Sequence, residues 1–145
     1  MPLPSLDVNG DLPSGVQHAS LQEILEGFAQ STPQRSVVGM RLARVYELAA
    51  ATGHVKRFIV FGSFVTSKSE PNDIDVFLIM DNSFELSEVT GEGRLIFEHA
   101  AAQAHFGSSV FWLRDLALTD EEQSIAGWQI KRDGTQRGIV EITEA

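Results

Sequence analysis

The sequence predicts a single α+β domain, because short apolar runs alternate with segments in which apolar residues recur at helical spacing. The runs at 58–61, 73–80 and 108–113 are typical of buried strands. The helical segments are bounded by cap and stop residues such as Ser20 and Gly53. A chain of 145 residues has the usual size of one domain, and no internal repeat divides it.

The N-terminal residues 1–19 are rich in proline and glycine, so we expect an irregular arm there. The rest, 20–145, should form the domain. Ser20 and Glu23 have the spacing of a capping box, which predicts a first helix ending just before Pro33.

The second helix should begin at Pro33 and stop at Gly53, since proline is favoured in a first helical turn and glycine ends helices. Its apolar residues fall on one face. We expect a solvated face to carry the arginines of this helix, Arg35, Arg41 and Arg44.

The second half of the chain should form two more helices and a hairpin. Residues 94–105 read as a helix whose inward positions are Leu95, Ile96, Ala100 and Ala104. A second capping pattern at 119–122 predicts a short helix. The alternation in 128–132 and 139–142, around Asp133 and Gly134, predicts a β-hairpin; the alternative is a helix continuing through Arg132.

Composition narrows the function classes. There are 20 acidic and 11 basic residues, for a net charge of −9, which disfavours general nucleic-acid binding and suits a small substrate or a basic protein partner. The absence of cysteine excludes disulfides and thiolate zinc sites. We expect no membrane span, and a cytoplasmic location.

The chemistry-bearing stretch runs from the apolar strand at 58–61 to Met80. Gly62 and Ser63 end that strand with a turn whose backbone N–H groups can approach a phosphate. Asp73 and Asp75 should project from one face of the next strand, where a divalent cation such as Mg²⁺ would relieve their repulsion. The alternative is an ordinary turn, with Asp73 beginning the strand and Asp75 facing water.

This motif resembles the nucleotidyltransferase superfamily of the DNA polymerase β type: an apolar strand, Gly-Ser, a spacer, then Asp-Ile-Asp-Val. Further segments resemble those of a bacterial group of small stand-alone proteins in this superfamily. These segments are LPSGV, GSFVTSK, PNDIDVFLIM and RDGTQRGIVEI. The resemblance implies a small mixed β-sheet flanked by helices and a site that uses Mg²⁺ and a nucleoside triphosphate. Gly62, Ser63 and Lys68 would then bind the triphosphate, and Asp73 and Asp75 would hold the metal.

Superfamily members that transfer nucleotides usually carry a third carboxylate on the strand beside Asp-x-Asp. The run at 108–113 should be that strand, and it contains no Asp or Glu. Ser109 or Phe111 would occupy the position, which leaves Asp115 as the nearest substitute general base and Glu98 as a weaker one.

Two functions therefore stay open at the level of sequence. One is a Mg²⁺-dependent nucleotidyltransferase in which Asp73, Asp75 and Asp115 act on a nucleoside triphosphate and an acceptor hydroxyl. The other is a non-catalytic nucleotide-binding or partner-binding protein, for example one component of a toxin–antitoxin pair. No Gly-x-Ser-x-Gly elbow or cysteine nucleophile suggests a hydrolase.

Overall fold

A five-stranded mixed sheet forms the centre of the computed structural model, which describes residues 3–68, 70–71, 73–131 and 133–143. The strand order is β1-β5-β2-β3-β4. β3 runs parallel to β4 and β1 runs parallel to β5, whereas β2 is antiparallel to both of its neighbours. The strands are β1 (Val16–Ala19), β2 (Val55–Phe61), β3 (Ile74–Met80), β4 (Ser108–Arg114) and β5 (Ile139–Ile142). The predicted α+β class is confirmed.

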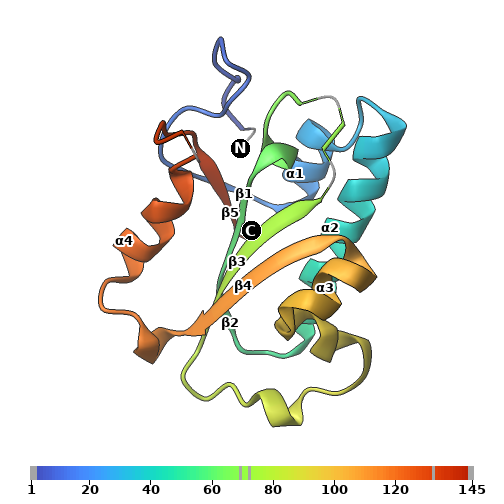
Figure 1. Cartoon of the computed structure of the whole chain (residues 1–145), viewed down its shortest axis with the longest axis vertical. Coiled ribbons are helices and arrows are strands. Elements are labelled where there is room, and N and C mark those ends of the chain that lie inside the picture. Colours follow the sequence, from blue (N-terminus) through green and yellow to red (C-terminus); the bar gives the residue numbers. More distant parts are fainter. Residues whose placement is uncertain (1–2, 69, 72, 132, 144–145) are drawn as a thin grey trace.

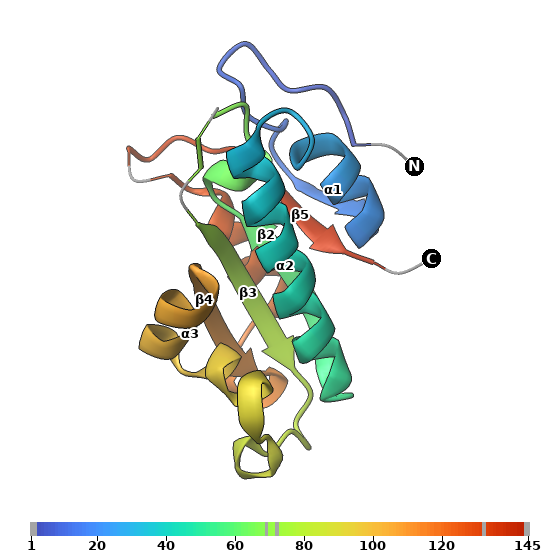
Figure 2. The same ribbon diagram turned by 90° about the vertical axis from the view of Figure 1, so that its right-hand side faces the viewer.

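Helices cover both faces of the sheet, as the two views in Figures 1 and 2 show. One face packs against α1, α2 and α3, and the other against α4. A larger apolar core fills the first interface and a smaller one, which includes Phe77 and Ile125, fills the second. The helices are α1 (Leu21–Phe28), α2 (Pro33–Ala51), α3 (His99–Phe106) and α4 (Glu121–Ala126).

Local cap signals position the first two helices as predicted. The Ser20 hydroxyl accepts from Glu23 N at 3.1 Å, and Ser20 N donates to the Glu23 carboxylate at 2.9 Å, which completes the capping box. α2 begins at Pro33 behind a Thr32 cap and ends before Gly53. Among the described residues, no helix is both long and apolar enough to cross a membrane.

The predicted N-terminal arm is irregular only in part. Residues 3–15 form no helix or strand, but 16–19 form β1, whose sheet partner is β5 at the far end of the chain. β1 has only four residues of mixed polarity, Val-Gln-His-Ala, which do not show the alternation typical of a strand. Its pairing with β5, which is distant in sequence, stabilises it.

The predicted helix at 94–105 is divided into two pieces. A 3₁₀ helix, η3 (Gly91–Phe97), precedes α3, and Glu98 between them is extended with φ −116° and ψ 107°. The break shifts the helical register, so Ala102 and Phe106 are buried, and the expected inward residues Ala100 and Ala104 are exposed.

The predicted hairpin near the C-terminus is wrong. A 3₁₀ helix, η5 (Gly127–Gln129), follows α4, and the first arm of the hairpin is reduced to a single bridge between Ile130 and Gln136. β5 pairs instead with β1 and β2. The expected turn survives, since Lys131 N donates to Thr135 O at 2.8 Å. The alternative helix through Arg132 ends on a residue outside the described part of the chain.

Candidate functional site

The antiparallel pairing of β2 and β3 brings the Gly-Ser turn next to the aspartates. Phe61, the last residue of β2, pairs with Asp75, so Gly62 comes directly beside the Asp75 side chain. Gly62 has φ 84° and ψ −166°, a conformation that only glycine adopts without strain. A Cβ atom built on Gly62 would lie 1.9 Å from Oδ2 of Asp75. The glycine is therefore required both for the turn and for the close approach of the carboxylate.

The turn itself is held by its own hydrogen bonds. Residues Ser63–Val65 form a 3₁₀ helix, η1, in which Val65 N donates to Gly62 O at 3.3 Å. Thr66 donates to Ser63 O from both its backbone N–H and its hydroxyl, at 3.2 and 2.7 Å. Phe64 and Val65 are fully buried, which fixes the turn against the larger core.

Asp73 immediately precedes β3, and Asp75 is its second residue. Both side chains are partly exposed, so a ligand from solvent can reach them. No group of three or more His, Cys, Asp or Glu within the described ranges could hold a metal ion. Two carboxylates are nevertheless the usual protein share of a Mg²⁺ site whose other oxygens come from phosphates and water. The carboxylate oxygens of Asp73 and Asp75 are of the ligand type that this cation prefers.

Lys68 lies in the exposed loop after the turn. Its backbone carbonyl accepts hydrogen bonds from Arg35, a role that the sequence did not predict. Arg35 was expected on a solvated helix face, but it is 3% exposed. Its guanidinium donates to the carbonyl oxygens of Phe28, Phe64, Thr66 and Lys68. Burial lowers the pKa of Arg35. Because three of these acceptors, Phe64, Thr66 and Lys68, lie in the turn and the loop that follows it, Arg35 clamps the loop that carries Lys68.

The strand beside Asp-x-Asp is β4, as predicted, and Ser109 stands in register with Asp75. Paired residues on neighbouring strands project from the same face, so Ser109 occupies the position expected for a third carboxylate. Its side chain is mostly buried, and its hydroxyl accepts from Gln103 Nε2 at 3.2 Å. A hydroxyl there is a hydrogen-bonding group and has no negative charge at neutral pH.

Asp115 does not substitute for that carboxylate. It follows β4 at the end where Arg114 pairs with Met80, six residues beyond Ser109, or about 20 Å along the strand. Its carboxylate binds Lys56 Nζ at 2.8 Å. The expectation failed because the sequence placed Asp115 just past the right strand without showing which end of that strand faces Asp75.

Lys56 and Arg57 join four acidic side chains at this opposite end of the sheet. Lys56 Nζ also binds Glu121 at 2.9 Å, and its hydrogen bonds, followed by those from Arg57, lower the pKa of Glu121. Hydrogen bonds led by those to Glu141 raise the pKa of Arg57. The cluster is an internally paired ion network that ties β2 to α4 and β5. Its acidic members are Asp115, Glu121, Glu122 and Glu141.

The remaining sequence candidates have structural partners. Glu98 is exposed and pairs with Arg94 at 3.3 Å. His99 Nδ1 lies 3.4 Å from Val110 O, and His105 Nε2 lies 3.1 Å from a Glu92 oxygen.

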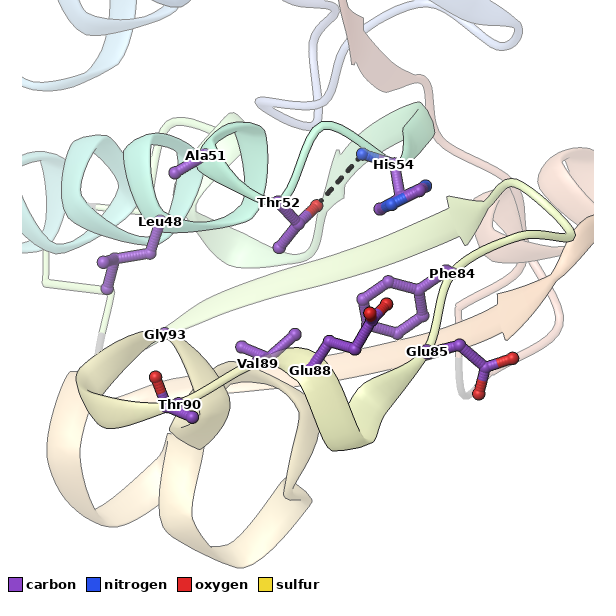
Figure 3. Close-up of a pocket in the computed structure, with 10 residues that line it drawn as sticks. All are labelled: Leu48, Ala51, Thr52, His54, Phe84, Glu85, Glu88, Val89, Thr90 and Gly93. Atoms are coloured by element: carbon purple, nitrogen blue, oxygen red, sulfur yellow. Dashed lines mark hydrogen bonds between the residues drawn. The ribbon is translucent and has the colours of Figure 1, made fainter.

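A separate pocket of about 470 Å³ lies between the end of α2 and the segment after β3 (Figure 3). His54 lines it, together with Phe84, Glu85 and Glu88. β2 begins and β3 ends at this side of the sheet, so the pocket is at the opposite end from Gly62 and Asp75. It takes no part in the geometry of the Gly-Ser turn.

His54 in this pocket does not belong to a hydrolytic triad. Its Nδ1 lies 2.9 Å from Asp81 Oδ1 and 3.4 Å from Ser83 Oγ. A triad needs the serine and the carboxylate on opposite ring nitrogens, whereas here both contact the same one. Hydrogen bonds from Ser83 and then His54 lower the pKa of Asp81. The group is a hydrogen-bonded turn at the end of β3, in which the Ser83 backbone N–H and hydroxyl both donate to Asp81 Oδ1.

Comparison with known families gives one match, to a family described as "Family of unknown function (DUF6932)", over residues 4–143. The chain belongs to the DUF6932 family. No curated protein and no solved structure matches it. Since the DUF6932 description assigns no activity, the site around Gly62 and Asp75 is what bears on function.

Proposed function

We propose that this DUF6932 protein is a Mg²⁺-dependent nucleotidyltransferase that transfers a nucleotide from a nucleoside triphosphate to an acceptor hydroxyl. The observation that carries the proposal is the contact geometry at Gly62, where the turn backbone and the Asp75 carboxylate meet without space for a Cβ atom. A phosphate-binding turn directly beside a metal-binding carboxylate is what a Mg²⁺–triphosphate requires.

The topology supports a nucleotidyltransferase-like fold. The strand that ends in Gly-Ser is antiparallel to the strand that begins with the aspartates, and β4 lies on the other side of β3. Helices α1, α2 and α3 pack on one face of the sheet (Figure 2). The resemblance of the central motif implied this arrangement of a small mixed sheet.

The residues would share the reaction as follows. Asp73 and Asp75 would hold Mg²⁺, which neutralises phosphate charge when bound, while Gly62, Ser63 and Lys68 would bind the triphosphate. The acceptor oxygen forms a bond to the α-phosphorus as the bond to the leaving pyrophosphate breaks, and pyrophosphate departs with that electron pair. The acceptor proton passes to solvent, because Ser109 offers no carboxylate to receive it.

A specific observation also favours a second function, which is nucleotide or partner binding without transfer. Ser109 occupies the position beside Asp75 where transferases usually carry their third carboxylate. Loss of a general base typically costs about 10²–10⁴-fold in rate, enough to leave a binder rather than an efficient enzyme. The net charge of −9 would suit a basic protein partner, as in a toxin–antitoxin pair.

Calorimetry tests the binding step that both functions share. The parent should bind at least one of ATP, GTP, CTP and UTP in a Mg²⁺-dependent manner, and an Asp73→Asn/Asp75→Asn variant should bind at least about 10-fold more weakly because the charge-assisted metal contacts are lost. Asp115→Asn is the matched control and should bind like the parent. Equal binding by parent and double variant, or no binding by the parent, contradicts the proposal.

Transfer of labelled nucleotide then separates the two functions. The parent, incubated with each α-labelled triphosphate and cell extract, should label an acceptor in the presence of Mg²⁺. The non-catalytic function would be established instead if the parent binds the triphosphate without labelling any acceptor and the Asp73→Asn/Asp75→Asn variant does not bind it.

A further inference from the structure

The face of the sheet that carries Asp75 continues as a surface of aromatic rings. Phe61 stands in register with Asp75 on one side, and one step along the same face Phe77 stands in register with Phe111. Trp128, from η5, packs over these strands. We call this group, Phe61, Phe77, Phe111 and Trp128, the aromatic platform.

The rings of the platform are in mutual contact. Trp128 lies at its centre, with ring centroids 4.5 Å from Phe61, 5.2 Å from Phe77 and 5.1 Å from Phe111. The interplanar angles of these pairs are between 31° and 40°, so the rings are tilted with respect to one another. Aromatic rings at such separations also attract a further flat ring, in offset or tilted contact.

Part of the platform is open to solvent. Phe77 is buried, but Phe111 is 38% exposed and Leu113, two residues further along β4, is 43% exposed. Phe111, Trp128 and Leu113 line a cavity of about 450 Å³ along β4. Large rings exposed beside a cavity are typical of binding sites for flat apolar groups.

The platform lies at a useful distance from the aspartates. Phe77 is two residues beyond Asp75 on the same face, which corresponds to about 7 Å along the strand. A ribose spans a similar distance between the α-phosphate and the base of a nucleotide. A triphosphate bound at Gly62 and Asp75 would thus bring its base to the row of Phe77 and Phe111.

We infer that Phe111 and Trp128 stack against the nucleobase of the bound nucleoside triphosphate. The inference rests on the proposed function and adds the recognition of the base. Every nucleobase has a π-face, so stacking gives affinity with little selection among bases. The protein should therefore bind ATP, GTP, CTP and UTP, with a modest preference for the larger purines.

Two probes separate the platform from the triphosphate site: Mg²⁺–ATP and Mg²⁺–tripolyphosphate, which has no base. In calorimetry, Phe111→Ala should weaken ATP binding about 10-fold. It should change tripolyphosphate binding less than 2-fold, and Phe111→Trp should keep parental ATP affinity. Leu116→Ala, an exposed apolar residue outside the platform, is the control and should change neither affinity.

The possible results are distinct. If Phe111→Ala binds ATP like the parent, or weakens ATP and tripolyphosphate equally, the platform does not hold the base, whereas the proposed function stands. A parent that binds neither probe overturns the proposed function and this inference together.

Fluorescence provides a second readout that does not depend on Phe111. In a Trp112→Phe background Trp128 is the sole tryptophan, because the chain contains two. Mg²⁺–ATP should quench its emission and tripolyphosphate should not. Equal responses to the two probes would contradict stacking on Trp128.

Discussion

Replacing Gly62 with alanine tests the geometry on which the candidate site depends. The new Cβ would lie 1.9 Å from Asp75 Oδ2 and 2.9 Å from its Cγ, so the carboxylate must move. The backbone conformation adds a cost of about 1–3 kcal/mol for a residue with a side chain. Displacing a packed neighbour typically costs about 1–3 kcal/mol more. We expect a total loss near 3–4 kcal/mol and the loss of Mg²⁺–ATP binding.

A matched control separates backbone strain from the contact with Asp75. Gly53 has φ 74°, and a Cβ there would meet nothing within 4 Å. Gly53→Ala should therefore cost only about 1 kcal/mol, the strain offset partly by lower entropy of the unfolded chain. Thermal unfolding should show a decrease of about 4 °C for Gly53→Ala and about 12 °C for Gly62→Ala.

A double variant supplies the decisive comparison. With Asp75→Ala in the background, the carboxylate is gone, and Gly62→Ala should then cost little more than its backbone strain. Coupling between the two changes would be about 1–3 kcal/mol. If Gly62→Ala loses no more stability than Gly53→Ala, and the two changes are additive, the close approach of turn and carboxylate is refuted.

Three further predictions concern the loop clamp, the ion network and the missing carboxylate. Arg35→Met should destabilise the protein by about 3 kcal/mol in denaturant unfolding, because buried carbonyls lose their donors; a loss below 1 kcal/mol would exclude the clamp. Glu121 has a folded pKa below its ordinary 4.5, so its pairing with Lys56 and Arg57 stabilises at neutral pH and is lost as pH falls below about 4.5. The stability difference between parent and Glu121→Gln should shrink over that range, and a difference constant from pH 7 to pH 3 would contradict it. Ser109→Asp should raise the rate of nucleotide transfer up to about 10²-fold, whereas the uncharged Ser109→Asn should not; equal rates would show that this position supplies no base.

Local signals in the sequence predicted much of the fold. Caps act within one helical turn, so the residues that form them are neighbours in the chain, as Ser20 and Glu23 are. Pro33 and Gly53 are local signals too, since each acts on the end of α2 next to it. The apolar runs of the sequence also predicted the buried strand β3 and the edge strand β4.

Pairing between distant strands was not predictable in the same way. The alternation at 139–142 is compatible with any strand partner, and the nearest one in sequence was the wrong choice. β1 has four residues and takes its stability from β5. Sequence periodicity reports which face of a strand is buried, but the identity of its neighbour depends on the whole sheet.

The sequence predicted that Gly62 and Asp75 lie together, but it did not show the roles of Ser109 and Arg35. Gly62 and Asp75 were placed together because a motif spans both, and their contact follows from one antiparallel pair. Ser109 could be assigned only once the register between β3 and β4 was known. Arg35 was missed because an arginine on a helix is most often solvated, and its carbonyl acceptors lie mainly in a loop about 30 residues away.

The order of the strands has a consequence for synthesis on the ribosome. β1 joins the sheet through β5, so β1 cannot form its native pairing until residues more than 100 positions further along the chain have been synthesised. While the chain emerges, β2, β3 and β4 can already assemble with α2 and α3, but β5, the strand with which β1 pairs, has not yet been made. Its docking should be a late event, completed only when the last strand has left the exit tunnel.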